Sequence, residues 1–391
     1  MAGFQLERLY CSILLQLEPK LPDVGARAVS NILWSSAKLG LNPDTFVPGM
    51  TDALAAKLLQ LTKDEARCQP SAQDCANSLW ALTTLGHEPA DKGLVDAMCN
   101  HFARLIGHHD DSKRPNAQET ANVVWALATL GHEPADKGLV DAVCGHFVIL
   151  IRHHDARKWP TSQGVSNVMW ALAEMNHAPL DGAASAILER LTRLCKLPGQ
   201  EPTAQELSNT LFACAVLRLK VKGHVSLALI DGLLRLDRAS DYKQEYCNAA
   251  WSLAVSGKLS HDIFRALLER LQPLPTAKSA HNALLIKGLR QLYQALDSLQ
   301  PLPDVAAQYL QATLSSLGQR PLPDAQQSAD SPVSRQLCAA LGQLCLAFTP
   351  EVPLSGYWVN AVLQPHDGVT DPIVLSSKGL HCFKNKDDRY V

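Results

Sequence analysis

The chain has 391 residues, of which 47% are hydrophobic and 19% are charged, and its formal net charge at pH 7 is −2. A hydrophobic fraction of this size can bury a core, so the composition excludes a largely disordered chain. The nearly balanced charge argues against a strongly basic nucleic-acid-binding protein, although a local stripe of Lys and Arg is compatible with it.

The N-terminal segment, residues 1–20, contains Glu7 and Glu18 and has no long apolar run. We therefore expect neither a secretory signal nor a clear organelle transit peptide. No stretch of the chain approaches the ~18 uninterrupted apolar residues that indicate a membrane-spanning helix, so we expect no membrane insertion.

A tetrapeptide of the form Asn-x-x-Trp returns along the chain. It occupies residues 31–34, 77–80, 122–125 and 167–170, recurs with Phe at 209–212, and returns with Trp at 248–251. The successive aromatic residues are separated by 46, 45, 45, 42 and 39 residues. A period of this length is typical of helical arrays. We therefore expect an all-α fold, a right-handed α-solenoid of helix-pair repeats, with about six units in residues 1–271 and a small α/β remnant at the C-terminus.

Each unit is predicted to contain two helices, A and B. Helix A should begin after a capping residue and end at a residue that tolerates the left-handed conformation. The expected caps are Ser71, Asn116, Thr161 and Thr203, and the expected ends are Gly86, Gly131 and Asn176. Helix B is expected at about residues 91–106 and 136–151. Residues 86–97 recur unchanged as residues 131–142, which indicates a recent duplication.

The eleven cysteines are scattered without a Cys-x-x-Cys pair. Cys75, Cys99, Cys144 and Cys214 lie in apolar segments with helical periodicity. We expect them to be small buried side chains in a reducing compartment, and not ligands of zinc or members of disulfides.

The repeat pattern weakens towards the C-terminus. We expect degenerate helical repeats in residues 272–318 and a linker in the Pro-, Gln- and Ser-rich residues 319–333. A helix at about 334–348 should open the terminal segment 334–391. Two strands are expected in that segment, one within residues 356–364 and one beginning at residue 373.

Amide side chains recur in phase with the tetrapeptide. A Gln stands four residues before the Asn, which places both on one face of helix A. The pairs are Gln73 and Asn77, Gln118 and Asn122, Gln163 and Asn167, and Gln205 and Asn209. Amides both donate and accept, so they could read base edges of RNA, or they could form a polar ladder that fixes the register of the repeats. We expect the Trp of each unit to lie in the core and the Asn to have a structural role.

The residue after each Gln varies. It is Asp74, Glu119, Gly164 or Glu206. Variation within a fixed frame is what a code with one letter per repeat would require, but an unconstrained solvent position gives the same pattern.

Basic residues cluster just before helix A. They are Lys113 with Arg114, and Arg157 with Lys158, the latter pair followed by Trp159. At the repeat spacing they could follow an RNA backbone, with Trp159 offering a face for a base. Ordinary solvated loop charge explains the same residues equally well.

Histidines also recur once per repeat, but copies one repeat apart do not provide the converging ligands of a metal site. No Ser/His/Asp arrangement, glycine-rich phosphate loop or carboxylate pair is evident. We therefore expect no metal, no cofactor and no enzymatic activity.

Residues 117–131, Ala-Gln-Glu-Thr-Ala-Asn-Val-Val-Trp-Ala-Leu-Ala-Thr-Leu-Gly, resemble the helix A signature of octotricopeptide repeat (OPR) proteins, as do residues 72–86 and 162–175. The resemblance covers about residues 20–260 and is closest to the green-algal type. It implies an α-solenoid that binds single-stranded RNA and supports processing, stability or translation of organelle transcripts, mostly in the chloroplast. The unit of 45 residues is longer than the family's usual unit.

The C-terminal residues resemble the opening of a RAP domain, which often follows such repeats. His381 and Phe383 partly keep the family's turn. Leu375, Ser376 and Ser377 stand where that family's core strand carries acidic residues, so metal-dependent cleavage is not expected. The segment is similar to a degenerate or truncated RAP domain.

Other interpretations remain open. Residues 157–160, Arg-Lys-Trp-Pro, resemble the motif of SKWP-repeat bacterial effectors, and a protein-interaction scaffold of the HEAT or armadillo kind fits the same repeats. Proteins of an RNA-processing or translation complex are possible further partners. A mitochondrial or cytoplasmic location is the alternative to the chloroplast.

Overall fold

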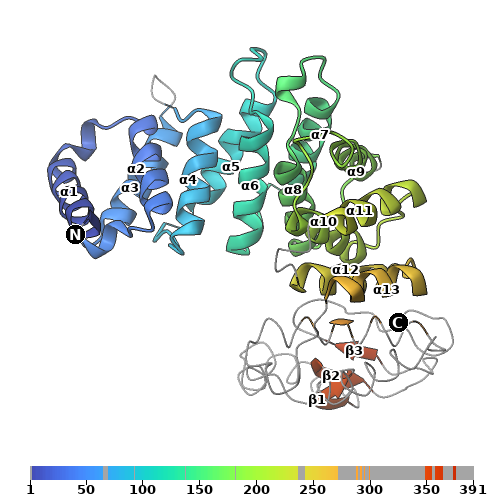
Figure 1. Ribbon diagram of the computed structural model, residues 1–391. Coiled ribbons are helices and arrows are strands. Elements are labelled where there is room, and N and C mark those ends of the chain that lie inside the picture. The colour runs from blue at the N-terminus through green and yellow to red at the C-terminus, as the bar shows by residue number, and fades with distance from the viewer. Residues whose placement is uncertain are drawn as a thin grey trace. The chain divides into compact units, whose positions relative to one another are not determined.

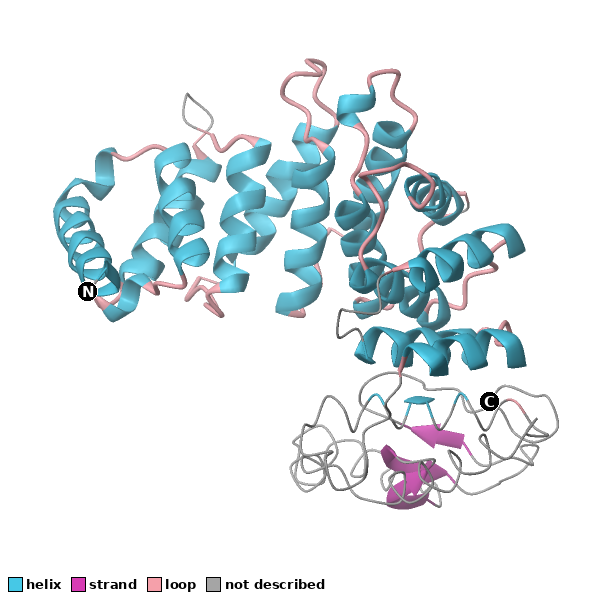
Figure 2. Ribbon diagram, in the orientation of Figure 1, coloured by secondary structure: helices cyan, strands magenta, loops and turns pink. Residues whose placement is uncertain are grey.

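The computed structural model describes residues 2–64, 69–91, 93–136, 138–180, 182–236 and 243–271, a few residues between 288 and 299, and three strands between 348 and 375. The chain divides into two compact units, residues 1–236 and residues 237–391. The first unit is an all-α solenoid of paired helices (Figures 1 and 2). The predicted fold class is confirmed.

Two sets of helices alternate along the first unit. The A helices are α2 (Ala26–Leu39), α4 (Ala72–Thr84), α6 (Ala117–Leu130), α8 (Ser162–Glu174) and α10 (Ala204–Val216). The B helices are α3 (Met50–Lys63), α5 (Gly93–Ile106), α7 (Leu139–Ile151), α9 (Ala183–Leu194) and α11 (Gly223–Arg235). Helix α1 (Ala2–Leu17) precedes them, and the short 3-10 helices are η1 (Glu18–Asp23), η2 (Pro43–Thr45) and η3 (Ala156–Lys158).

The four predicted caps of the A helices are confirmed. Ser71, Asn116, Thr161 and Thr203 each accept a hydrogen bond from a backbone N–H in the first turn of the helix that follows. The predicted ends are confirmed as well, because Gly86, Gly131 and Asn176 all have positive φ, at 64°, 60° and 48°. These caps satisfy backbone groups that a helix leaves unpaired at its termini.

Helices α5 and α7 begin slightly later than predicted, at Gly93 and Leu139. The Asp91 carboxylate accepts from the N–H of Gly93, and the Asp136 carboxylate accepts from the N–H of Gly138, both at 2.8 Å. A local turn of this kind competes with the helix for the backbone, so the helix starts after it.

Small residues let the A helices pack side by side. Each A helix contacts the next one along the array, and each B helix contacts the next B helix. The residue before the Asn of each tetrapeptide is buried and small: Ser30, Ala76, Ala121, Ser166 and Ser208. The Ser30 hydroxyl donates to the Asp74 carbonyl at 3.2 Å, which shows that this flank of α2 faces α4. Close approach of neighbouring helices leaves only one face of each A helix open.

The core lies between the A and B layers. Phe102 of α5 and Phe147 of α7 are fully buried there, together with leucines of both layers. The four cysteines expected in the core, Cys75, Cys99, Cys144 and Cys214, are buried there and form no disulfide among the described residues. No single helix pair could bury its apolar face alone, so the repeats stabilise one another.

The second unit contains the helices α12 (Lys243–Val255) and α13 (His261–Arg270) and a three-stranded antiparallel sheet in the order β1-β2-β3. The strands are β1 (Phe348–Leu354), β2 (Tyr357–Leu363) and β3 (Ile373–Leu375). β2 and β3 confirm the two predicted strands, whereas β1 was missed. β1 contains Pro350 and Pro353, which sequence patterns count against a strand, but an edge strand tolerates prolines because its outer N–H groups need no partner.

The predicted linker 319–333 and most of the predicted degenerate repeats 272–318 lie outside the described residues, as do His381 and Phe383. The predicted extent of the array, residues 1–271, stays a prediction. Its last expected pair corresponds to α12 and α13, which lie in the second unit.

Candidate functional site

One face of every A helix in the first unit carries the same four rows of side chains. The rows are spaced i, i+4, i+7 and i+11, which places them on a single helical face. We call this surface the A-helix stripe. Its members are Arg27, Asn31, Trp34 and Lys38 on α2; Gln73, Asn77, Trp80 and Thr84 on α4; Gln118, Asn122, Trp125 and Thr129 on α6; Gln163, Asn167, Trp170 and Glu174 on α8; and Gln205, Asn209, Phe212 and Val216 on α10.

The amides of the stripe face outward. Gln73, Gln118, Gln163 and Gln205 are exposed, and Asn77, Asn122, Asn167 and Asn209 are half-buried. Within the described part of the chain, none of these eight side chains has a hydrogen-bond partner. The structural role expected for the Asn stays a prediction for these four repeats. The amides retain both donors and acceptors for an external ligand.

The tryptophans of the stripe are only partly core residues, so the expectation from sequence is met in part. Trp80, Trp125 and Trp170 are half-buried and lie against the edge of the core, and Trp34 is 40% exposed. The Trp stands seven residues after the Gln and three after the Asn, so its indole lies on the same helical face as the two amides. Helices α4, α6 and α8 thus each place two amides and one half-buried indole on this face, whereas α2 has Arg27 in the Gln row and α10 has Phe212 in the Trp row.

At the start of the stripe, Lys38 lies between two tryptophans. Its Nζ is 5.7 Å from the ring centroid of Trp34 and 4.8 Å from that of Trp80. An ammonium at these distances is attracted to both rings. No sequence pattern indicated this contact, because Lys38 belongs to one helix and Trp80 to the next.

The residues that correspond to Lys38 in the next two repeats are short. Thr84 and Thr129 each donate a hydrogen bond to a carbonyl of their own helix, at Trp80 and Trp125 respectively, both at 2.8 Å. In the described residues, no cation or second ring covers the indole of Trp125 or Trp170. These two rings are therefore the open stacking faces of the stripe.

The variable position after each Gln is a capping position and not a letter of a code. Asp74, Glu119 and Glu206 accept hydrogen bonds from the backbone N–H of their N-cap residues, at 2.9, 2.8 and 2.8 Å. Both halves of a capping box are present in each case. Gly164 lacks the carboxylate, so α8 has only the Thr161 half. The variation reflects how well each helix is capped.

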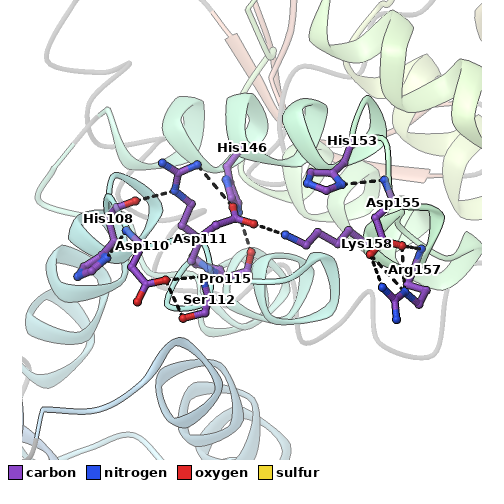
Figure 3. Close-up of polar contacts among 11 residues, drawn as sticks. His108, Asp110, Asp111, Ser112, Pro115, His146, His153, Asp155, Arg157 and Lys158 are labelled. Carbon is purple, nitrogen blue, oxygen red and sulfur yellow. Dashed lines mark hydrogen bonds and ion pairs between the residues drawn. The ribbon is translucent and has the colours of Figure 1, made fainter.

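The basic pairs before the A helices are largely bound within the protein (Figure 3). Asp111 pairs with Lys158 of the next repeat and with Arg114, whose Nη1 lies 3.6 Å from it. Arg114 Nε also donates to the His108 carbonyl at 2.6 Å. The hydrogen bond from Lys158, reinforced by its charge and that of Arg114, lowers the pKa of Asp111.

Arg157 has a similar acidic partner, Asp155, at 2.9 Å between Nη2 and Oδ2. The hydrogen bonds from Arg157 lower the pKa of Asp155 to about 2. Lys113 is exposed and has no ion pair in the described residues. Of the four predicted phosphate-binding residues, Lys113 is thus the one whose charge is least compensated.

Trp159 is not available as a stacking face, contrary to the prediction. Its Nε1 donates to the His153 carbonyl at 2.7 Å, and the guanidinium of Arg190 lies over its ring at 5.0 Å from the centroid. Trp159 occupies the place that Arg114 has one repeat earlier, where Arg114 donates to His108. Both side chains hold the same loop.

The histidines and one arginine of the B helices fasten the start of each A helix. His101 and His146 each place Nε2 2.7 Å from the carbonyl of the proline before the N-cap, at Pro70 and Pro115. Arg190 takes the same role at Pro160, with Nε at 3.0 Å. We call these contacts the proline-carbonyl latches. Burial lowers the pKa of His101 and of His146 below the usual value.

A second set of histidines joins neighbouring repeats. His87, His132 and His177 lie 3.0, 3.0 and 2.9 Å from aspartates in the B helix of the preceding repeat, at Asp52, Asp96 and Asp141. Sequence reasoning noticed the repetition of these histidines but not their partners. These histidines recur because each one makes the same contact with an aspartate of the preceding repeat.

The sixth Asn-x-x-Trp copy, on α12 in the second unit, has its two amides joined by a hydrogen bond. Gln244 Nε2 donates to Asn248 Oδ1 at 2.8 Å and to Gln291 Oε1 at 3.0 Å. Gln291 is buried, so this copy is engaged within the unit. The contact demonstrates that a Gln at this position can donate to an amide oxygen brought beside it.

Other chemistry finds little support in the described residues. They contain no group of three or more potential metal-ligating side chains. Burial raises the pKa of Cys99 and of Cys144 to about 12, so these thiols stay protonated and unreactive. None of the described helices combines the length and apolar character that crossing a bilayer requires.

Comparisons with known proteins give no family. No family model and no curated protein matches the chain. Among solved structures, it is similar to the crystal structure of an engineered protein from the Northeast Structural Genomics Consortium. The match has 15% sequence identity, covers 73% of this chain and 97% of that chain, and has a TM-score of 0.26. A similarity this low carries no argument about function.

Proposed function

We propose that residues 1–236 bind single-stranded RNA along the A-helix stripe. Unpaired bases would stack on the tryptophans, and the Gln and Asn amides would bond to the base edges. The observation that carries the proposal is the set, repeated on α4, α6 and α8, of one half-buried indole and two amides that have no hydrogen-bond partner among the described residues. Helical-repeat proteins that read RNA use two or three side chains per repeat for one base, including an aromatic or planar group for stacking.

The arrangement favours single strands over duplexes. A base can stack on an indole and present its edge to an amide only when it is unpaired. Duplex binding relies instead on phosphate contacts, and most of the basic loop residues already have acidic partners.

The repeats should also prefer the same base at successive positions. Helices α4, α6 and α8 all present Gln, Asn and Trp in the same order. Identical side chains offer identical hydrogen bonds, so they cannot distinguish different bases at different repeats. We therefore expect a preference for a tract of one base over a mixed sequence.

We further propose that the protein is of the OPR type and supports processing, stability or translation of an organelle transcript, in the chloroplast, through binding and without catalysis. The support is the resemblance of residues 72–86, 117–131 and 162–175 to the helix A signature, together with the outward direction of the amides in those segments. The RAP-like relation of the C-terminal strands is part of the same proposal.

A protein-binding scaffold is the second candidate. It is favoured by the uncharged middle of the stripe and by the ion pairs that occupy Arg157 and Lys158. An extended peptide has a carbonyl and an N–H at every residue, and these could also bond to the Gln and Asn rows.

Direct binding distinguishes the two candidates. The full chain would be titrated against labelled single-stranded RNA homopolymers and a mixed sequence. The Asn122→Ala variant should lose affinity about fivefold or more, the scale of a hydrogen bond to a base edge of at least 1 kcal/mol. Asn100, exposed on α5, supplies the matched control Asn100→Ala. Crosslinking in cells followed by RNA sequencing would identify the target, and absence of any enriched transcript together with no binding in solution would reject the RNA proposal.

A further inference from the structure

We call the space between the aromatic rings of two neighbouring A helices a step of the A-helix stripe. The first step, between Trp34 and Trp80, differs from the later ones by one side chain. The ammonium of Lys38 lies within 6 Å of the ring centroids of both Trp34 and Trp80, at 5.7 and 4.8 Å. At the corresponding position, α4 and α6 carry Thr84 and Thr129, whose hydroxyls turn back to their own helices. Among the residues that the structure describes, the stripe thus has a cation over its rings at the N-terminal end and none over Trp125 or Trp170.

We propose that Lys38 is a plug that sets the N-terminal limit of the RNA track. This inference rests on the proposed function. A base approaching the space between Trp34 and Trp80 must displace the ammonium from two rings, whereas a base at Trp125 or Trp170 displaces no such group. The bound tract therefore begins after the Trp34–Trp80 step.

The other end of the open segment has a different limit. Glu174 of α8 is exposed at the position of Lys38 and carries a negative charge, which disfavours the approach of a phosphate. The next repeat has Phe212 in the Trp row and Val216 in the fourth row. The steps with Thr at the fourth position, Trp80–Trp125 and Trp125–Trp170, lie between these two limits and are the segment that a short tract of one base fits best.

A phosphate-binding role for Lys38 predicts the opposite change in RNA affinity. If Lys38 bound a phosphate, its removal would weaken binding and make the affinity less sensitive to salt, by a slope of about 0.7 per contact on a logarithmic scale. If Lys38 is a plug, its removal strengthens binding and lengthens the preferred tract. The two roles therefore differ in the sign of the effect.

The test exchanges the fourth-row residues between repeats. Lys38→Thr gives α2 the residue of α4, and Thr84→Lys gives α4 the residue of α2. Lys38→Arg keeps a cation over the rings, and Thr84→Ser keeps a short hydroxyl, so these two are the matched controls. Both positions are exposed on a helix, and circular dichroism checks that each of the four variants keeps its helical content.

Each variant of the full chain is titrated with a length series of the single-stranded homopolymer that the wild type binds best. Lys38→Thr should bind about fivefold tighter, the lower value for one added base stack, and should reach full affinity with an oligonucleotide one nucleotide longer. Thr84→Lys should weaken binding and shorten the preferred length by one nucleotide. The two control variants should match the wild type.

Weaker binding by Lys38→Thr, or an unchanged preferred length in both exchanges, would overturn the plug while leaving the RNA function intact. If neither the wild type nor any variant binds RNA, and an extended peptide changes the tryptophan fluorescence instead, the proposed function fails. The role of Lys38 as a limit of the RNA track then fails with it.

Discussion

The A-helix stripe and the loops that precede the A helices both repeat along the chain, and both carry polar side chains suited to RNA. In the stripe, the amides are exposed or half-buried and have no partner in the described residues. In the loops, Arg114, Arg157 and Lys158 are held by aspartates, and Trp159 is held by His153 and Arg190. Repetition alone therefore does not identify a binding surface; the surface is where repetition coincides with unsatisfied bonding capacity.

The largest expected difference between the two regions concerns their tryptophans. The double variant Trp125→Leu with Trp170→Leu keeps apolar contact with the core but removes both open stacking faces. RNA affinity should fall about 30-fold or more, because stacking on an aromatic side chain contributes about 1–3 kcal/mol per base. Fluorescence anisotropy with a labelled homopolymer measures the change.

Trp159→Leu is the matched loop variant. It should leave RNA affinity within twofold of the wild type, since its ring is already covered by Arg190. Its loss should instead appear as reduced thermal stability. Equal losses of affinity in the stripe and loop variants would contradict the division between the two regions.

The proline-carbonyl latches should contribute to stability and not to binding. His101→Ala leaves the Pro70 carbonyl without its donor, at a cost of about 2 kcal/mol in the free energy of unfolding. Urea denaturation followed by circular dichroism measures this cost. The RNA affinity of the variant, measured where it is fully folded, should not change.

The same latches predict a direction for pH. Burial lowers the pKa of His146, so the unfolded chain binds a proton more readily than the folded chain. The contribution of neutral His146 to the free energy of unfolding is complete above about pH 6.5, the pKa of a histidine in the unfolded chain. It is lost as the pH falls below that value. Asp111, Arg114 and Lys158 also influence His146, so His146→Gln is compared with the wild type across the same pH range. A pH dependence that is identical in both proteins would contradict this assignment.

Releasing the basic residues of the loops should have a smaller effect. Asp111→Asn removes the charge that holds Lys158 and Arg114. RNA binding should become a few-fold tighter and its logarithmic salt slope steeper by about 0.7 for each released cation that reaches a phosphate. An unchanged slope would indicate that these loops lie away from the bound strand.

The smallest effect is expected at the variable capping position. Gly164→Glu should complete the capping box of α8 and remove a helical glycine, which stabilises the fold by about 1 kcal/mol. The nearest atoms to an added Cβ are 3.6 to 3.9 Å away, so a Cβ is accommodated without a clash. Base preference should not change, and a shift in preference would restore the interpretation of this position as part of a code.

The amino-acid sequence by itself determined the solenoid and much of its local structure. The period of the tetrapeptide numbered the repeats, and the capping residues and the left-handed ends fixed the bounds of the A helices within about one residue. These features depend on interactions between residues close in the chain, which a sequence displays directly.

Only the tertiary structure decided which face of the A helices is open. An Asn-x-x-Trp motif places its amide and indole on one side of a helix, but the sequence does not say whether that side meets another helix or the solvent. The small residues Ser30, Ala76 and Ala121 bring the A helices together at their flanks, and this packing leaves the tryptophans at the surface.

The partners of the loop charges and of Lys38 depend in the same way on packing. Lys158 meets Asp111 and Lys38 meets Trp80 across a repeat boundary, at separations of 47 and 42 residues in the chain. Contacts of this range are created when neighbouring repeats stack, so local patterns cannot reveal them. The sequence thus determined the repeated units, and their stacking decided which polar groups were satisfied and which stayed open to a ligand.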